Sequence, residues 1–270
     1  MGDRRSLPAR AAGRAWHAAE QAVEALLERR LGVDSGGTVY LEETGDADAE
    51  RVWHVPSDWL ALRRALRRLR PGPQDVLADI GAGRGRGVLV AAGLPFGRVI
   101  GVELSAPLAA AARRNVERAR PRLACRDVEL VTTDATTWPV PDDLTVAYMY
   151  SPLLGGAFEA VLANLLASVD RRPRLLRLVY AFPFEHRRVL ATGRAEVIDA
   201  SPGSAFGLSR TGPDTLLTYA LRPSRPAPEV EAAIARARRP LGRARAWRDP
   251  LHDPGMVLHR EGEARRPGDT

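Results

Sequence analysis

The chain of 270 residues has no lysine, one cysteine and five histidines, and these scarcities exclude several kinds of site. Because Cys125 is alone, no disulfide can form within the chain and a zinc site built from thiolates is excluded. The histidines lack the short spacing typical of metal-binding pairs, so we expect no metal. Cys125 precedes an expected strand, where a cysteine is more often a small packing residue than a nucleophile.

Long apolar runs are also missing. No stretch approaches the roughly 20 apolar residues that a helix needs to cross a bilayer. The N-terminus lacks the apolar core of a secretion signal. Hydrophobic residues nevertheless make up 45% of the chain, enough for one sizeable core. We therefore expect a soluble, cytoplasmic protein without a membrane partner.

All the positive charge comes from arginine, and the formal net charge is +7. An excess of arginine favours partners that carry phosphate or carboxylate groups. The arginines are spread along the whole chain, however, so a compositional bias that fills solvated faces explains them better. A nucleic-acid partner is disfavoured on this ground and stays an open alternative.

The apolar pattern divides the chain into three expected parts. Residues 1–72 form a helical N-terminal extension, residues 73–223 a core domain, and residues 224–270 a tail rich in proline and arginine. Within the tail, a short helix is expected over about 229–239.

Two helices are expected in the N-terminal extension. The first lies within 1–32 and ends at Gly32, and the second covers 58–70 with Ser57 as its N-cap. Such an extension could cover a substrate site or pack under the sheet. The candidate lid residues are Tyr40, Trp53, His54 and Trp59.

From residue 75 onward, short aliphatic strands alternate with helices. Their lack of strict alternation is typical of parallel strands that are buried on both faces. Two further strands, 194–200 and 214–222, follow each other without a helix and indicate an antiparallel pair at the sheet edge. The expected fold is α/β: a doubly wound, mostly parallel seven-stranded sheet with one antiparallel edge strand. The other expected strands cover 75–80, 98–103, 127–133, 143–150 and 174–182, with helices over about 85–93, 106–119 and 156–169.

The most informative motif is VLADIGAGRG, residues 76–85, which is a strand followed by a glycine turn and a helix start. Glycines let a ligand approach the backbone, and the ligand then meets amides at a helix N-terminus. Dinucleotide-binding proteins use such a turn too, so a nicotinamide-dependent oxidoreductase is an alternative. Two details disfavour it. Arg86 stands where the third glycine of that pattern belongs, and its side chain would obstruct the tight helix–strand packing. The carboxylate of Asp79 suits a cationic group better than a pyrophosphate.

Two further acids follow the next two strands. Glu103 ends the second strand, 22 residues after Gly81, and a carboxylate there can accept hydrogen bonds from both hydroxyls of a ribose. The third strand runs into Asp134-Ala135, beside the place where an adenine on that ribose would lie.

Together, these motifs over residues 75–222 resemble the class I S-adenosylmethionine-dependent methyltransferases. The resemblance implies S-adenosylmethionine as cofactor. It also implies that Glu103 binds the ribose hydroxyls, Asp134 the adenine amino group, and Asp79 lies near the methionine amino group. The residues implied to bind the cofactor are Asp79, Gly81, Gly83, Gly85, Glu103, Asp134 and Ala135.

The expected transfer site follows the fourth strand, at Tyr150-Ser151-Pro152. This segment is similar to the Asn-Pro segment of many N-methyltransferases, but Ser151 replaces the amide side chain. A Phe182-Pro183-Phe184 segment after the fifth strand resembles the non-SET histone-lysine methyltransferases and their bacterial relatives. These aromatic rings could line an acceptor pocket or belong to the core.

The predicted activity is methyl transfer to a nitrogen or oxygen nucleophile of a small molecule or a protein side chain. Tyr150, Ser151, His54 and Glu185 are the candidates for a general base. A non-catalytic or nucleic-acid-binding module on the same fold is the competing interpretation, supported by the arginine-lined helix 58–70.

Overall fold

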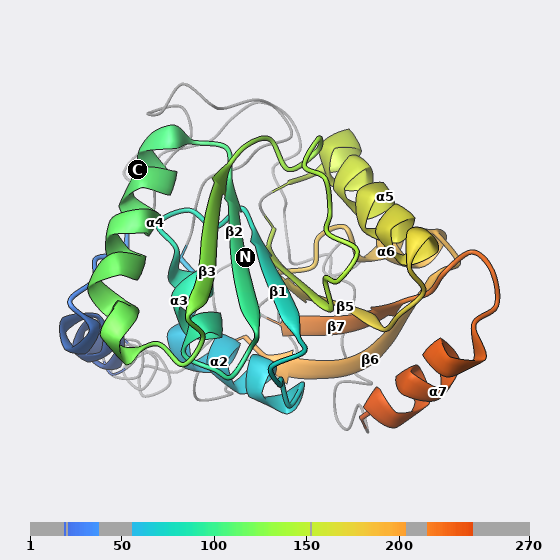
Figure 1. The fold of residues 1–270 in the computed structure, drawn as a ribbon, viewed down its shortest axis with the longest axis horizontal. Helices are drawn as coiled ribbons and strands as arrows, with labels where there is room; N and C mark the ends of the chain where they lie inside the picture. Colours follow the sequence, from blue (N-terminus) through green and yellow to red (C-terminus); the bar gives the residue numbers. More distant parts are fainter. Residues whose placement is uncertain (1–18, 20, 38–55, 152, 204–214, 240–270) are drawn as a thin grey trace, which may run out of the picture.

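The structure is a computed structural model that describes residues 19, 21–37, 56–151, 153–203 and 215–239. A seven-stranded sheet with the order β3-β2-β1-β4-β5-β7-β6 forms its centre (Figure 1). The strands are β1 (Val76–Ile80), β2 (Arg98–Glu103), β3 (Asp127–Thr132), β4 (Val146–Tyr150), β5 (Leu176–Ala181), β6 (Ala195–Pro202) and β7 (Thr215–Leu221).

The sheet is mostly parallel. Strands β1 to β5 pair in parallel with their neighbours, and β7 pairs antiparallel with both β5 and β6. The predicted α/β fold and the antiparallel pair at the sheet edge are therefore confirmed. Within that pair, β7 is the strand that runs against the others, and β6 lies outside it at the edge.

Helices cover both faces of the sheet. In Figure 1, α3 and α4 lie on one side and α5 and α6 on the other. The short helix α6 follows β5 and is not predicted from the sequence pattern. The described helices are residues 21–31 near the N-terminus, α2 (Trp59–Arg68), α3 (Arg86–Ala92), α4 (Ala106–Ala119), α5 (Gly155–Arg171), α6 (His186–Ala191) and α7 (Pro228–Ala237).

The start of α2 differs from the prediction. Asp58, not Ser57, is the N-cap, and its carboxylate accepts a hydrogen bond from the Ala61 amide at 2.6 Å. The hydroxyl of Ser57 instead lies 2.5 Å from the phenol oxygen of Tyr148 on β4. Serine and aspartate are about equally good caps, so local sequence could not separate them. The buried partner of Ser57 decides the question.

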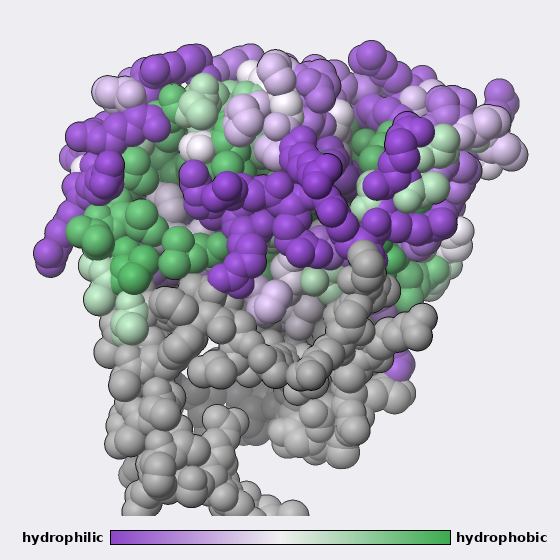
Figure 2. Space-filling view, turned by 90° about the horizontal axis from the view of Figure 1, so that it is seen from below, coloured by the Kyte–Doolittle hydropathy of each residue, from purple (hydrophilic) through white to green (hydrophobic). Residues whose placement is uncertain are grey.

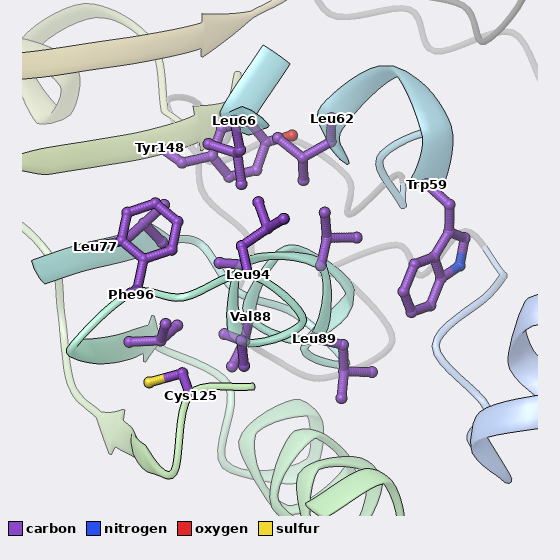
Figure 3. Packing of buried hydrophobic residues seen from close by; sticks show 14 of the residues in the cluster. Trp59, Leu62, Leu66, Leu77, Val88, Leu89, Leu94, Phe96, Cys125 and Tyr148 are labelled. Carbon is purple, nitrogen blue, oxygen red and sulfur yellow. The ribbon is translucent and has the colours of Figure 1, made fainter. Parts of the chain in front are cut away.

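One apolar core lies between the sheet and the helices α2, α3 and α4. Figure 3 shows Trp59, Leu62 and Leu66 of α2 pointing toward Val88 and Leu89 of α3. The opposite face of the sheet packs on α5, which buries eight of its side chains. A helix layer therefore packs on each face of the sheet, and this close packing fixes the positions of the strand ends.

The arginines of α2 line its outer face. Arg63, Arg64, Arg67 and Arg68 are all exposed. In Figure 1, α2 lies along the lower edge, and Figure 2, which views the molecule from below, shows hydrophilic side chains with apolar patches between them. Among the described residues, no helix is long and apolar enough to cross a membrane.

The three-part division of the chain at residues 72 and 223 stays a prediction.

Candidate active site

The expected site residues lie in a row along one edge of the sheet. Strands β3, β2, β1, β4 and β5 are adjacent and parallel, so their carboxyl ends meet at the same edge. From β3 to β4 there are three strand spacings of about 4.8 Å, or about 14 Å in all. That length suits a nucleoside joined to an amino acid. The row reads Asp134 after β3, Glu103 at the end of β2, the glycine turn after β1, Ser151 after β4 and Phe182 after β5.

The glycine turn needs its glycines for their backbone conformation. Gly81, Gly83 and Gly85 have φ angles of 79°, 55° and 87°, in the left-handed region that other residues rarely adopt. The turn is fixed to β2, because the amides of Gly81 and Ala82 both donate to the carbonyl of Val102, at 2.9 and 3.0 Å. The loop therefore has one defined shape, beside the first turn of α3.

Glu103 holds the turn from the neighbouring strand. Its carboxylate accepts one hydrogen bond from the Gly83 amide at 2.7 Å and another from the Ser105 amide at 2.8 Å. The residue is 6% exposed. Each carboxylate oxygen has two acceptor sites. Glu103 therefore fixes the glycine turn to the end of β2 through two backbone amides.

Asp79 is buried under the turn, with 3% of its surface exposed. A methyl group at Gly87 would lie 2.3 Å from its carboxylate, so only glycine lets α3 approach β1 this closely. Burial, followed by the nearby carboxylate of Glu103, raises the pKa of Asp79 to about 7, while a hydrogen bond from the Val88 amide acts in the opposite direction. Because the two carboxylates are buried close together and repel each other, binding of a positively charged group beside them is favourable.

Arg86 does not obstruct the packing of α3 on the strand, contrary to the sequence argument. The close approach occurs at Gly87, one residue later. The Arg86 side chain is 4% exposed and makes ion pairs with Glu24 and Glu28 of the helix 21–31. It therefore points away from the strand and toward the N-terminal segments.

The adenine end of the expected site follows β3. One carboxylate oxygen of Asp134 accepts from both the amide and the hydroxyl of Thr136, each at 2.8 Å. These bonds fix the turn after β3 and the direction of the acid. Ala135 is half-buried and packs against the core on the α5 side of the sheet.

The ends of β4 and β5 carry the expected transfer site. Ser151 and Phe182 have positive φ angles of 41° and 49°, which are costly for residues with side chains. The Ser151 hydroxyl donates to the carbonyls of Ala181 and Phe182. The ring of Tyr150 lies 5.1 Å from that of Phe182, centroid to centroid. Pro152 lies outside the described residues.

Phe184 extends this aromatic group, with its ring centroid 6.2 Å from that of Phe182. Among the candidate bases, Glu185 makes a hydrogen bond and an ion pair within the protein. Its carboxylate accepts from the Gly155 amide at 2.8 Å and pairs with Arg188 at 2.7 Å. His54 lies outside the described residues.

Two buried polar residues near the turn were missed by the sequence analysis. Tyr148 pairs with Asp79 across β1 and β4, and burial followed by the charge of Asp79 raises its pKa well above the ordinary value. The amide side chain of Asn115 on α4 donates hydrogen bonds to the carbonyls of Asp34 and Arg84. A tyrosine within an apolar strand carries no local signal. Asn115, by contrast, was visible as the one amide side chain in an alanine- and arginine-rich helix.

The position of the Trp59 side chain shows which of the two predicted roles this lid candidate has. Trp59 is 5% exposed and packs in the core, so the structure shows the packing alternative for this residue. The other candidates, Tyr40, Trp53 and His54, lie outside the described residues.

Comparison with protein families gives a match to the methyltransferase domain model over residues 77–177, from β1 into β5. The matched segment contains the glycine turn, Glu103, Asp134 and Ser151. This match identifies a methyltransferase domain in that segment of the chain. A comparison of the sequence with curated proteins finds no match.

Several solved structures are similar to this chain in fold. One is a dimethyladenosine transferase from Plasmodium falciparum, with 12% identity over 63% of this chain and 63% of that enzyme and a TM-score of 0.45. Another is a TehB-like S-adenosylmethionine-dependent methyltransferase from Corynebacterium glutamicum, with 15% identity over 76% and 98% of the two chains and a TM-score of 0.46. A third is a glycopeptide N-methyltransferase in complex with S-adenosylmethionine, with 16% identity over 63% and 98% and a TM-score of 0.47.

Proposed function

We propose that this chain is an S-adenosylmethionine-dependent methyltransferase that transfers a methyl group to a nitrogen or oxygen nucleophile of a small molecule or a protein side chain, held at the carboxyl ends of β4 and β5. The observation that carries the proposal is the arrangement of Ser151 and Phe182. Both have left-handed backbones, and the hydroxyl of one is bonded to the carbonyl of the other. Strain of this kind persists only where the surroundings enforce it, and it gathers at functional sites.

The cofactor is proposed to lie along the row of strand ends. The charge of its methionine amino group suits Asp79, whose raised pKa reflects a buried carboxylate beside a second one. Its ribose hydroxyls suit the carboxylate of Glu103, and its adenine suits the turn after β3. When bound, S-adenosylmethionine supplies a methyl group that its sulfonium already activates. The proposed binding residues are Asp79, Gly81, Gly83, Gly85, Glu103, Asp134 and Ala135.

At the acceptor side, the chain offers oxygen atoms and aromatic rings. The Ser151 hydroxyl donates its proton to backbone carbonyls and is also hydrogen-bonded with the Tyr180 phenol. A hydroxyl oxygen has two lone pairs, so it can also accept from an N–H or O–H group of the methyl acceptor. The rings of Tyr150, Phe182 and Phe184 lie beside it and can pack on the acceptor. The protein's part in the reaction is then to hold the nucleophile in line with the methyl group and to exclude water.

A substitution at Ser151 tests this assignment. Ser151→Ala removes the acceptor lone pairs and leaves cofactor binding intact. We expect kcat/KM for the acceptor to fall about 10- to 100-fold, the range of a lost positioning hydrogen bond, and the dissociation constant of S-adenosylmethionine to change less than twofold. The measurement is transfer of labelled methyl to a panel of amines, alcohols, peptides and RNA, with calorimetry for the cofactor.

The matched control is Ser168→Ala. Ser168 is also buried, and its hydroxyl donates to the Pro141 carbonyl at 3.1 Å, but it lies near the other end of α5. We expect this variant to lose stability without any change of acceptor kcat/KM. Equal activity losses in both serine variants would contradict the proposal, as would transfer to RNA alone.

A further inference from the structure

Arg86 is a buried cation that neither the cofactor nor the acceptor site accounts for. It begins α3, directly after the last glycine of the turn, and only 4% of its side chain is exposed. An arginine is rarely buried to this extent without several partners, because a charge out of water is costly. Its partners therefore indicate what the residue does.

Those partners come from separate parts of the chain. One terminal nitrogen of Arg86 donates to Glu24 and to the carbonyl of Ser57, both at 3.0 Å. The other donates to Glu28 at 3.1 Å, and Nε donates to the Ser35 hydroxyl at 3.1 Å. One guanidinium thus joins the helix 21–31, the segment 33–37 and Ser57, two residues before α2, to the helix that starts at the glycine turn.

The partners of Arg86 are also tied to one another. Glu28 accepts from the amide and the hydroxyl of Ser35, at 3.0 and 2.7 Å. On its outer side, the guanidinium lies 5.8 Å from the ring centroid of Trp59. Such a contact of an arginine with an indole face is attractive, more so when water is excluded. The cluster is therefore closely interlinked, and removing the guanidinium leaves two acids and a hydroxyl without their shared donor.

A second set of bonds fixes the same segment to the turn itself. The Asn115 side chain accepts from the Asp34 amide at 3.0 Å and donates to the Asp34 carbonyl at 2.7 Å. It also donates to the carbonyl of Arg84, inside the turn, at 3.0 Å. Arg84 in turn donates to the carbonyl of Gly36 at 3.2 Å. The segment 33–37 is therefore bonded on one side through Arg86 and on the other through Asn115 and Arg84.

A third link reaches the acid under the turn. The Ser57 carbonyl is bonded to Arg86, and its hydroxyl lies 2.5 Å from the phenol oxygen of Tyr148. Tyr148 is the residue paired with Asp79 across β1 and β4. A displacement of Arg86 would therefore shift residues on both sides of the turn: Arg84 on one side and Tyr148, the partner of Asp79, on the other.

From these contacts we propose that Arg86 is a positioning residue for S-adenosylmethionine binding, which clamps the helix 21–31 and the segment 33–37 onto the glycine turn. The N-terminal segments are then part of the frame of the cofactor site. The inference rests on the cofactor and not on the acceptor, so the Ser151→Ala experiment above can fail without affecting it. By linkage, a segment that favours cofactor binding must itself be stabilised by the bound cofactor to the same degree.

Arg86→Gln and Arg86→Lys test the clamp. Glutamine removes the charge, whereas lysine keeps the charge but cannot span partners in several directions. We expect the dissociation constant of S-adenosylmethionine, measured by calorimetry, to rise at least tenfold in the glutamine variant and less in the lysine variant. At saturating cofactor, kcat should stay within threefold of the wild type, because the residue does not touch the reacting atoms.

Hydrogen exchange gives a readout that is independent of activity. In the wild type, S-adenosylmethionine should slow amide exchange in residues 21–37, and Arg86→Gln should speed that exchange without cofactor and abolish the slowing. Faster exchange in 21–37 together with an unchanged dissociation constant would show a merely structural residue and overturn the proposal.

Two more variants keep the test decisive. Glu28→Gln perturbs the clamp from the other side, so it should also weaken cofactor binding, and it serves if Arg86→Gln does not fold. Arg68→Gln is the matched control, because Arg68 pairs with Asp199 at 2.6 Å and joins α2 to β6 instead of to the turn. It should leave the dissociation constant within twofold, and a tenfold rise there would overturn the specificity of the clamp.

Discussion

Replacing Asp79 by asparagine should make the protein without cofactor more stable, and this gain should depend on pH. Burial and the carboxylate of Glu103 raise the pKa of Asp79 from 3.8 to about 7. Because each pKa unit corresponds to about 1.4 kcal/mol, holding this carboxylate charged in the folded protein costs about 4 kcal/mol above pH 7. Asparagine has a similar shape, can accept the hydrogen bond from Val88, and carries no charge at any pH.

The sign follows from the two pKa values. At pH 3 the carboxyl is protonated in both the folded and the unfolded chain, so the cost is absent. As the pH rises from about 4 to about 7, the unfolded chain releases its proton first, and the free energy of unfolding of the wild type falls. Asp79→Asn lacks this fall. Its stability gain over the wild type should therefore be about 2 to 3 kcal/mol larger at pH 8 than at pH 5.

Urea denaturation of both proteins at pH 5 and pH 8, without cofactor, measures this difference. Asp75→Asn is the control with the opposite sign. Asp75 is also buried, but it pairs with Arg177 at 2.9 Å, so its removal leaves a buried cation unpaired and should destabilise the protein. If Asp79→Asn were less stable than the wild type at pH 8, or gained the same at both pH values, the electrostatic account of Asp79 would be refuted.

Two further outcomes follow from the geometry of the turn. Glu103→Gln places an NH2 group against the amide of Gly83 or Ser105, so calorimetry should show S-adenosylmethionine binding at least tenfold weaker, and unchanged affinity would remove Glu103 from the cofactor site. Gly87→Ala puts a methyl group 2.3 Å from the Asp79 carboxylate and should lower the free energy of unfolding by about 1 to 3 kcal/mol. Gly93→Ala, whose methyl group would meet only a flexible arginine side chain and helix carbonyls at 3.2 Å or more, should change it much less, and equal losses in the two glycine variants would contradict this packing argument.

The shape of the glycine turn and the row of strand ends were predictable because short stretches of sequence determine them. A glycine turn between a strand and a helix has few possible conformations, and Gly81, Gly83 and Gly85 all adopt the left-handed backbone that the motif requires. Parallel strands then bring Glu103 and Asp134 to the same edge without any further information. Alternation of strands and helices is enough to predict such a sheet.

The acceptor half was less predictable because contacts between distant residues determine it. Nothing in the sequence around Ser151 or Phe182 indicates a left-handed backbone, since neither residue is glycine or asparagine. Their conformations go together with a hydrogen bond between residues 31 positions apart, on neighbouring strands. Pattern analysis placed both residues at strand ends, and only the structure shows that one is bonded to the other.

Ser57 and Arg86 show the same limit at the N-terminal segments. Judged locally, Ser57 was a helix cap and Arg86 an obstacle to close packing. Their roles depend on Tyr148, 91 residues from Ser57, and on Glu24, 62 residues from Arg86. A buried guanidinium needs acceptors on several sides, and one chain segment cannot supply them all. The residue that departed from the dinucleotide pattern is therefore the one that joins the N-terminal segments to the cofactor turn, and its departure has a physical reason: a glycine there could not hold these segments.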